Sequence, residues 1–440
     1  MPEVTILMLS DHGMSPVRSA PTLDEKHWGV DYIGLLAYMF IDYCRVQTMY
    51  PALAMLQLGK LSLLLAMLGV IVSSAMPPAH SNVRLKAAIV ALVVCTCLSG
   101  VAAHYTTVPV SALWTIPERL IVVFLIGRSV TNQWREKRFL FLVMVLMLKV
   151  AQHGLRIYAV THSHAVDEMA FVKFGIIGGG GGFYDNSADL GVAMCVVFGL
   201  SLALCQAQLG KTSRLFYITC VLSFGALIVV CGSRGAIVGA VAIIFAAWVR
   251  SPRKSWAAAF VLLFAAALVF LMPQASRTRF QNAEDYQTDE TANHRVQLWH
   301  AGLKMWHDYP LLGVGPANFK YVRQASYRIA AAQDSQAYVC HSLYIEVISE
   351  LGLFGSISAI GIVIFFFYTT TRIRHRLKQL NAAVVSWEYC LCSGCDLAMI
   401  GYLVSGAFVS VFWYPHLWVL CGIVMGLNTA TAAPQDSDSN

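Results

Sequence analysis

One histidine and four arginines are the residues of this 440-residue chain that could do chemistry together. His341 stands at the end of a long polar passage, from about Ser276 to Gly355, where hydrophobic sequence resumes. An unperturbed histidine has a pKa of about 6.5, so it can take up and release a proton near neutral pH. The four arginines are Arg234, Arg295, Arg323 and Arg328. His341 is therefore the candidate general base.

The arginines indicate an anionic substrate. Their guanidinium groups stay protonated and match phosphate with a rigid fork of donors. A lipid-linked diphosphate would suit them, and departure of a diphosphate needs charge neutralisation but no general acid. One base and several arginines would suffice for glycosyl transfer by direct displacement. Asp285, Asp289 and Glu290 could hold a divalent metal, but the outer loops contain no Asp-x-Asp motif, so arginine is favoured over a metal.

The composition indicates that the sequence around this passage lies in a membrane. The chain is 57% hydrophobic and 12% charged, against roughly 25% charged in ordinary soluble domains. A bilayer crossing needs about 17 to 25 apolar residues, which predicts an all-α, polytopic bundle of about twelve transmembrane helices. They lie near 30–44, 52–75, 86–104, 109–130, 138–157, 186–207, 214–231, 235–249, 255–272, 343–368, 394–413 and 415–430. The first 29 residues are mixed and polar, so no cleavable signal peptide is expected.

Positive charge predicts the orientation of these helices. Fifteen lysines and arginines fall in short loops on one side, and only Arg45 and Arg234 in the short loops opposite. The fifteen are Arg84, Lys86, Arg128, Arg135, Lys137, Arg138, Lys211, Arg214, Arg250, Arg253, Lys254, Arg372, Arg374, Arg376 and Lys378. The positive-inside rule then places both termini in the cytoplasm and the polar passage outside it. The net charge of +7 reflects this orientation rather than nucleic acid binding.

The predicted organisation has four parts. Residues 1–272 hold transmembrane helices one to nine, 273–342 form the large outer loop, 343–430 hold helices ten to twelve, and 431–440 are a cytoplasmic tail. Within the loop, Val296, Trp299, Leu303 and Trp306 recur at helical spacing, and Pro310 stops the pattern. The loop should therefore contain an amphipathic helix that lies on the membrane surface or caps the bundle.

Charged residues and thiols in the predicted helices each allow two interpretations. Charges inside a membrane are costly, so they usually face a bundle interior or a water-filled cavity. Glu118 and Arg119 are therefore either a structural ion pair near an interface or the lining of a cavity. Cys390, Cys392 and Cys395 cluster on the cytoplasmic side, but no second cluster or nearby histidine completes a metal site, so structural thiols are favoured. No metal site is predicted elsewhere.

A set of short motifs extends across roughly 120 residues of the chain. They are Ser233–Gly235, Arg295 with Trp299, Pro310–Phe319, His341–Tyr344 and Glu350–Gly355, with Phe183–Asn186 further upstream after five glycines. Together they resemble the O-antigen ligase and polymerase superfamily of bacterial envelope glycosyltransferases, most closely the ligases. The resemblance covers about the C-terminal two thirds. The sequence departs from the common pattern at Ser342, where Asn is frequent, and at Ala317, where Gly is frequent.

The resemblance implies a multi-pass enzyme of the bacterial inner membrane whose active site faces the periplasm. Its donor would be an undecaprenyl diphosphate-linked glycan, its acceptor a lipid A-core sugar, and it would need no cofactor. By this likeness His341 would activate the acceptor hydroxyl, while Arg234 and Arg295 would hold the diphosphate. The other candidate substrate contacts are Arg323, Arg328, Asn186 and Tyr344.

Three alternatives to an O-antigen ligase stay open. Two are members of the same superfamily: an O-antigen polymerase and a protein O-oligosaccharyltransferase. The third is a transporter of lipid-linked sugars, which would also use outward arginines. A transporter is less favoured, because it should show repeated halves with broken helices in matching positions, whereas nine helices precede the loop here and three follow it.

Overall fold

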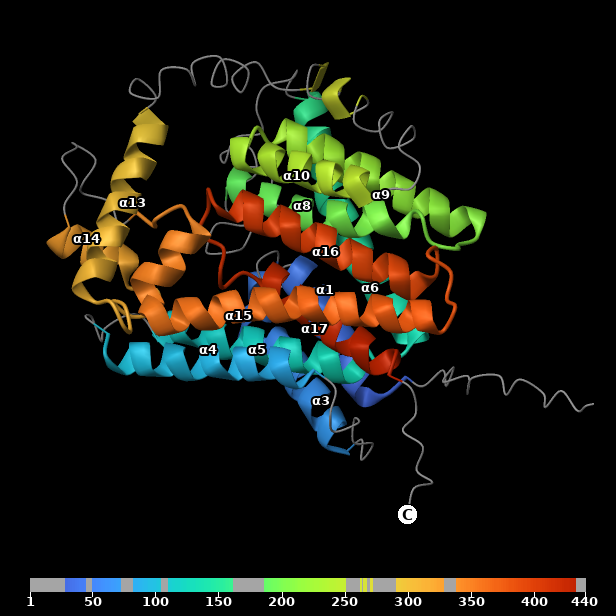
Figure 1. Ribbon diagram of the computed structural model, residues 1–440, viewed down its shortest axis with the longest axis horizontal. Helices are drawn as coiled ribbons and strands as arrows, with labels where there is room; N and C mark the ends of the chain where they lie inside the picture. The colour runs from blue at the N-terminus through green and yellow to red at the C-terminus, as the bar shows by residue number, and fades with distance from the viewer. Residues whose placement is uncertain are drawn as a thin grey trace, which may run out of the picture.

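The computed structural model describes residues 28–44, 50–72, 82–103, 110–160, 186–250, 262, 264–266, 270–271, 290–327 and 338–432. Within these ranges every regular element is a helix, as the all-α prediction requires (Figure 1). The elements are α1 (Val30–Cys44), η1 (Pro51–Leu56), α3 (Leu58–Val72), α4 (Val83–Val101), α5 (Val110–Ser129), α6 (Gln133–Val160), α8 (Ser187–Leu204), α9 (Lys211–Val230), α10 (Arg234–Arg250), α13 (Glu290–Asp308), α14 (Phe319–Ser326), α15 (Leu343–Gln379), α16 (Trp387–Gly406) and α17 (Pro415–Ala430).

Eleven of the twelve predicted crossings coincide with helices, and the ninth, near 255–272, falls mostly outside the described residues. Six of the described helices are long and apolar enough to cross a membrane, namely α4, α6, α8, α9, α15 and α16. Two more, α3 and α17, are apolar but shorter. The chain is thus consistent with a polytopic helical membrane protein, and the number of about twelve crossings stays a prediction.

Helix α8 lies at the centre of the bundle. Each of its residues from Asp189 to Leu204 is buried. It packs against α16 at such close range that a Cβ on Gly199 would come within 2.7 Å of the backbone nitrogen of Ala398. Small residues permit this approach between membrane helices, where packing rather than hydrophobicity drives association. The α8–α16 pair therefore forms the rigid centre around which the other helices stand.

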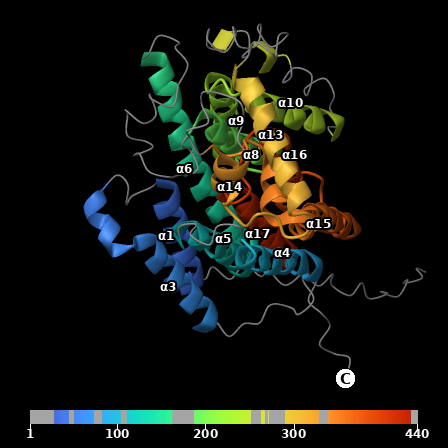
Figure 2. The same ribbon diagram turned by 90° about the vertical axis from the view of Figure 1, so that its left-hand side faces the viewer.

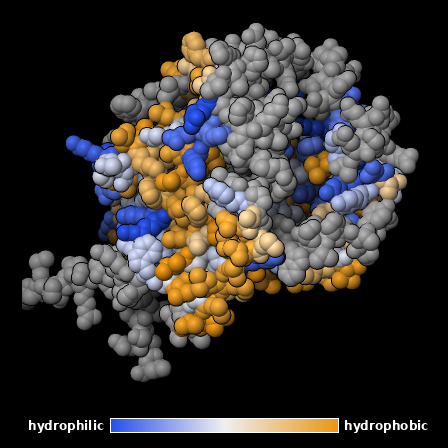
Figure 3. Space-filling view, turned by 180° about the vertical axis from the view of Figure 1, so that it is seen from behind, coloured by the Kyte–Doolittle hydropathy of each residue, from blue (hydrophilic) through white to orange (hydrophobic). Residues whose placement is uncertain are grey.

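The outer surface of the bundle is hydrophobic. Large apolar side chains remain exposed on several helices, among them Leu64, Val90, Leu222, Phe245 and Ile360. Figure 3 shows a broad hydrophobic field over one face of the molecule. Soluble monomers rarely expose contiguous apolar patches of more than a few hundred Å². These faces are therefore suited to contact with lipid.

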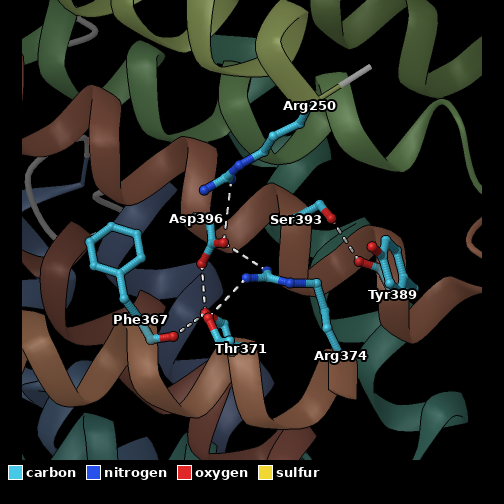
Figure 4. A network of polar contacts seen from close by, with 8 residues as sticks. Arg250, Phe367, Thr371, Arg374, Tyr389, Ser393 and Asp396 are labelled. Atoms are coloured by element: carbon cyan, nitrogen blue, oxygen red, sulfur yellow. Dashed lines mark hydrogen bonds and ion pairs between the residues drawn. The ribbon is translucent and has the colours of Figure 1, made fainter. Parts of the chain in front are cut away.

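One end of the bundle is held by an ion-paired network centred on Asp396 of α16 (Figure 4). The Asp396 side chain is fully buried. It accepts hydrogen bonds from Arg374 Nη1 at 2.7 Å and from Thr370 Oγ1 at 2.7 Å, and it pairs with Arg250 Nη1 at 3.3 Å. The ends of α10 and α15 are thereby fastened to α16.

Predicted cytoplasmic residues from the described part of the chain lie at this same end. Gln133 donates to Glu388 at 2.6 Å, and the Lys137 ammonium lies 5.4 Å from the ring centre of Trp387. The start of α6 therefore meets the start of α16, close to Asp396 and Arg374. His341 precedes the other end of the long helix α15, so the charged end and the His341 end are opposite ends of the bundle.

A second polar group lies between α1 and α5. Arg119 pairs with Asp42 through Nη1 at 3.2 Å and donates to the hydroxyl of Tyr38 at 3.0 Å. Glu118 accepts a hydrogen bond from the same hydroxyl at 2.7 Å. Arg119 is buried. The ion pair that the sequence suggested between neighbours is therefore formed by Arg119 with a residue of another helix.

Candidate active site

Helix α13 covers the His341 end of the bundle (Figure 2). Its buried residues Leu298 and Met305 share a small core with Val314, Phe319 and Cys340. Residues on its other side, Val296 and Leu303, remain exposed. The helix predicted in the loop therefore exists and ends at Asp308, just before Pro310, and it caps the bundle with one side while its other apolar side is left uncovered.

Two motifs that are well separated in the sequence pair with one another here. The backbone N–H of Val314 donates to Ser349 O at 2.9 Å, and that of Leu353 donates to Pro310 O at 2.8 Å. Gly352 has φ 62° and interrupts the regular geometry of α15, which frees backbone groups for this pairing. A Cβ on Gly313 would stand 2.4 Å from the carbonyl carbon of Glu350. Both glycines are thus required by the contact between the two segments.

The Glu350 side chain fixes the rest of this turn. Its carboxylate accepts the backbone N–H of Ala317 at 2.8 Å and that of Phe319 at 3.2 Å. Phe319 is the first residue of α14, and a carboxylate is favourable at a helix start because it satisfies free N–H groups and opposes the helix dipole. Ala317 has φ 58°, the left-handed region that favours glycine, which accounts physically for the frequency of glycine there.

His341 occupies a constrained position at the start of α15. Its φ is 51°, a left-handed conformation that is uncommon for residues other than glycine. The preceding Cys340 is buried, and its Sγ lies 3.2 Å from both the carbonyl oxygen of Ser342 and the hydroxyl of Ser410. Backbone strain held in this way by surrounding contacts is typical of functional sites.

The α13–α14 side of His341 is basic. Burial, the charge of Arg295 and the proximity of His294 together lower the pKa of His341 to about 4. The pKa of His294 is lowered in turn by burial and by the charge of Arg323. Desolvation and nearby positive charge both disfavour an imidazolium. His341 is therefore neutral at physiological pH, as a general base must be.

A cavity of about 210 Å³ lies against His341. The start of α8, the first turns of α15, the turn before α14 and the segment between α16 and α17 all contribute to it. Its lining residues are Asn186, Asp189, Ala317, Phe319, Lys320, Val339, Cys340, His341, Glu346, Glu350, Val409, Ser410, Trp413 and Tyr414. Asn186 caps α8 by accepting the N–H groups of Ala188 and Asp189, both at 2.9 Å.

The structure brings some of the predicted site residues to this cavity and leaves others apart. His341 and Asn186 line it, and Arg295 lies close enough to His341 to affect its charge. Arg323 is fully buried on α14, beside His294. Tyr344 is turned away, with its hydroxyl donating to Leu403 O at 2.9 Å.

The remaining predicted residues lie at the start of α10 or outside the described residues. Arg234 is the first residue of α10, and a Cβ on Gly191 would stand 3.4 Å from the Cβ of Ser233, so α10 begins near the start of α8. Arg328, Asp285 and Asp289 lie outside the described residues, as does the run of five glycines. Among the residues that the structure describes, no group of three histidine, cysteine or acidic side chains is arranged to hold a metal ion.

Sequence reasoning missed the acidic and aromatic part of the cavity, formed by Asp189, Glu346, Trp413 and Tyr414. Both acids stand inside stretches that were identified only as hydrophobic crossings. A carboxylate in such a stretch is costly and most often faces a bundle interior. That signal could have marked Asp189 and Glu346 from the sequence alone.

An apolar groove of about 330 Å³ runs beside the cavity. It is lined by α15 and by residues of α16, α17 and their connection, including Leu343, Val347, Ile360, Leu403 and Phe412. Leu343 is two residues after His341, so the groove starts next to the polar cavity and continues along the hydrophobic part of α15.

A family model described as O-antigen ligase matches residues 218–360. This match spans Arg234, Arg295 and His341. Residues 218–360 are thus similar to the O-antigen ligase family. The resemblance that the motifs indicated is thereby confirmed, and it supports a membrane glycosyltransferase-like role that uses lipid-linked glycans. The segment also includes Glu350 and Glu346, whereas Asp189 and Trp413 lie outside the matched residues. No curated protein matches the chain.

Proposed function

We propose that this protein is an O-antigen ligase, which moves a glycan from undecaprenyl diphosphate to a sugar hydroxyl of lipid A-core at the periplasmic face of the inner membrane. The observation that carries the proposal is the state of His341. It is held in a left-handed conformation at the wall of a cavity, next to Arg295, and its pKa of about 4 keeps it uncharged.

In this reaction His341 acts as the general base. It removes the proton from the acceptor hydroxyl while the oxygen attacks the anomeric carbon of the donor sugar. A new C–O bond forms, the bond from that carbon to the diphosphate oxygen breaks, and both bonding electrons leave with the undecaprenyl diphosphate. General base catalysis of this kind typically contributes about 100- to 10,000-fold.

Arg234 and Arg295 neutralise the leaving diphosphate. Arg295 lies within the electrostatic reach of His341, and Arg234 begins α10 at the same end of the bundle as the start of α8. A guanidinium group bonds two phosphate oxygens at once. A diphosphate stabilised in this way can depart without a proton donor, so no metal is assigned to the reaction.

The apolar groove supports a donor with a long hydrocarbon chain. It lies beside the cavity and is lined almost entirely by aliphatic and aromatic side chains, such as Val347, Ile360 and Phe412. A polyprenyl chain could lie in it while the diphosphate stays near the arginines. The arrangement favours a lipid-linked donor over a soluble nucleotide sugar.

The deletion strain tests the acceptor. Loss of the long-chain lipopolysaccharide ladder, with accumulation of lipid-linked polymer, is the expected phenotype. Loss of the polymer itself would indicate an O-antigen polymerase, and unglycosylated secreted proteins would indicate a protein O-oligosaccharyltransferase. Accumulated lipid-linked precursor on the cytoplasmic side would indicate a transporter.

Complementation with single variants tests the chemistry. His341→Gln should fail to restore the ladder although the protein is present in the membrane. His300→Gln is the matched control, because His300 is an exposed histidine of α13 in the same region. Restoration of a normal ladder by His341→Gln would contradict the proposal.

A further inference from the structure

The wall of the cavity that adjoins His341 is lined by three acidic side chains. Asp189, Glu346 and Glu350 all line it, and Lys320 is the one lysine or arginine among the described lining residues. Arg295, which faces His341 from α13, does not line this cavity. The site is thus divided into a basic side and an acidic side, with His341 between them.

The three carboxylates differ in how many of their oxygens are already used. Both oxygens of Glu350 accept backbone N–H groups. Asp189 Oδ2 accepts from Asn186 Nδ2 at 2.9 Å and from the Tyr414 hydroxyl at 3.0 Å. Glu346 Oε2 accepts the N–H of Phe412 at 3.2 Å, and no described contact occupies its Oε1. Glu346 therefore presents one oxygen to the cavity as an acceptor.

An aromatic ring stands beside these acids. Trp413 lines the cavity and is stacked against Trp418, with ring centres 5.7 Å apart and an interplanar angle of 13°. This stacking, together with an edge contact to Phe412, holds the Trp413 ring in place. A fixed indole ring next to carboxylates presents an apolar face and hydrogen-bond acceptors to the same ligand.

We propose that this cavity is the subsite for the acceptor sugar, with Glu346 and Trp413 as its main binding groups. The inference rests on the proposed function, since it assigns the acceptor side of the same reaction. Ring hydroxyls are donors that a carboxylate accepts, and the C–H face of a sugar ring packs on an aromatic side chain. Polyhydroxylated rings match this combination of groups.

The acidic lining of the subsite disfavours the donor diphosphate and selects among acceptors. A diphosphate placed here would stand against three acidic side chains, so the leaving group belongs on the arginine side. The same lining disfavours a phosphorylated or carboxylated sugar in the subsite. The acceptor sugar that enters it is uncharged or carries an amino group, even where other parts of the acceptor are phosphorylated.

The first experiment measures transfer kinetics with purified enzyme, lipid-linked donor and lipid A-core from the same bacterium. Glu346→Gln should raise KM for the acceptor about 3- to 10-fold, the factor expected from one hydrogen bond, and Trp413→Leu should raise it as well. The kcat should change much less, and KM for the donor should stay within about twofold. Glu388→Gln is the matched control, because Glu388 pairs with Gln133 at the opposite end of the bundle.

The second experiment needs no transfer. Binding of methyl glucoside, methyl glucosaminide and methyl glucuronide to the detergent-solubilised protein is compared by saturation-transfer NMR. These probes share a ring and differ in charge, so the amino sugar should bind best and the glucuronide worst. In Glu346→Gln the difference between them should shrink.

These outcomes separate failure of the inference from failure of the proposed function. If the wild-type enzyme transfers no glycan yet binds the glycosides in the expected order, only the proposed transfer reaction is contradicted. The subsite is overturned if both variants keep a normal KM for the acceptor. It is also overturned if KM for the donor rises together with KM for the acceptor. If both variants fail to fold, the wild-type glycoside order decides, and equal or tighter glucuronide binding overturns the subsite.

Discussion

The carboxylate of Glu350 accepts the backbone N–H of Ala317 at 2.8 Å, although 33 residues separate the two in the sequence. This hydrogen bond joins the turn before α14 to the first half of α15. His341 stands at the start of α15, and Ala317 lines the same cavity, so the bond fixes two walls of the site relative to one another. Glu350 thus acts on the site through the backbone that it holds.

Removal of this anchor should destabilise the site region. Glu350→Ala leaves the N–H groups of Ala317 and Phe319 without their acceptor, and each buried orphan costs about 1–3 kcal/mol. The free energy of unfolding should therefore fall by about 2–6 kcal/mol, with transfer lost. Thermal unfolding in detergent measures the stability. Glu388→Gln should unfold at the wild-type temperature, and equal stability of Glu350→Ala would show that the turn is held by other contacts.

Ala317 is expected to accept glycine. Its φ of 58° is left-handed, a conformation that costs about 1–2 kcal/mol for residues other than glycine. Part of this gain is lost because glycine makes the unfolded chain more flexible, so Ala317→Gly should leave stability unchanged or raise it by up to about 1 kcal/mol.

Gly313→Ala is the contrasting variant, because its Cβ would stand 2.4 Å from the backbone of Glu350. It should unfold at a clearly lower temperature than wild type. Equal destabilisation by Ala317→Gly and Gly313→Ala would contradict the left-handed turn.

The helices and the motif segments could be predicted from the sequence because they depend on local patterns. A crossing must satisfy its backbone hydrogen bonds within itself, so an apolar stretch of sufficient length indicates a helix wherever it lies. Pro310 ends α13 for an equally local reason, since proline cannot continue a helix. The position of His341 at the start of α15 followed from the boundary between polar and apolar sequence.

Contacts between helices could not be predicted in this way. Glu118 and Arg119 are neighbours in the sequence, but adjacent residues on a helix do not face one another, and Arg119 pairs with Asp42 instead. The bond between Asp189 and Tyr414 joins residues 225 positions apart. Neither pattern nor composition specifies such pairs, and the acidic wall of the cavity is built from them.

Transfer is expected to survive metal chelation, because the arginines are proposed to neutralise the diphosphate. Arg234→Lys and Arg295→Lys should each reduce kcat/KM severely despite keeping the charge, since an ammonium cannot reproduce the two parallel bonds of a guanidinium. Purified enzyme assayed with and without chelator provides the measurement. Loss of activity in chelator that magnesium restores would direct attention to the acidic segment 284–290.

Reporter fusions should place the two ends of the bundle in different compartments. The predicted cytoplasmic residues Arg250 and Arg374 lie at the Asp396 end, opposite His341, and the positive-inside rule assigns that end to the cytoplasm. A reporter fused after Gln281 should be active only outside the cytoplasm, and one fused after Asn381 only inside it. The reverse pattern at both positions would put His341 in the wrong compartment for the proposed reaction.

The pH dependence of transfer tests His341 as the base. Its pKa is lowered from 6.5 to about 4, chiefly by burial and then by the charge of Arg295. Since the base is active when neutral, the rate should be level between about pH 6 and 8 and reach half its maximum only near pH 4, well below the 6.5 expected of an unperturbed histidine. His341→Gln should lose about 100- to 10,000-fold in rate at every pH.

Stability must be measured beside the rate, because protonation of His341 also favours the unfolded chain. The unfolded histidine takes up its proton near pH 6.5 and the folded one only near pH 4. The free energy of unfolding therefore declines as the pH falls from 6.5 to 4. In Arg295→Gln the pH at which the residual activity falls to half should rise but stay below 6.5. Burial, the larger cause of the lowered His341 pKa, remains in this variant. A wild-type limb already at 6.5 would exclude buried His341 as the base, and His294, His300 or His307 of α13 would then be tested in its place.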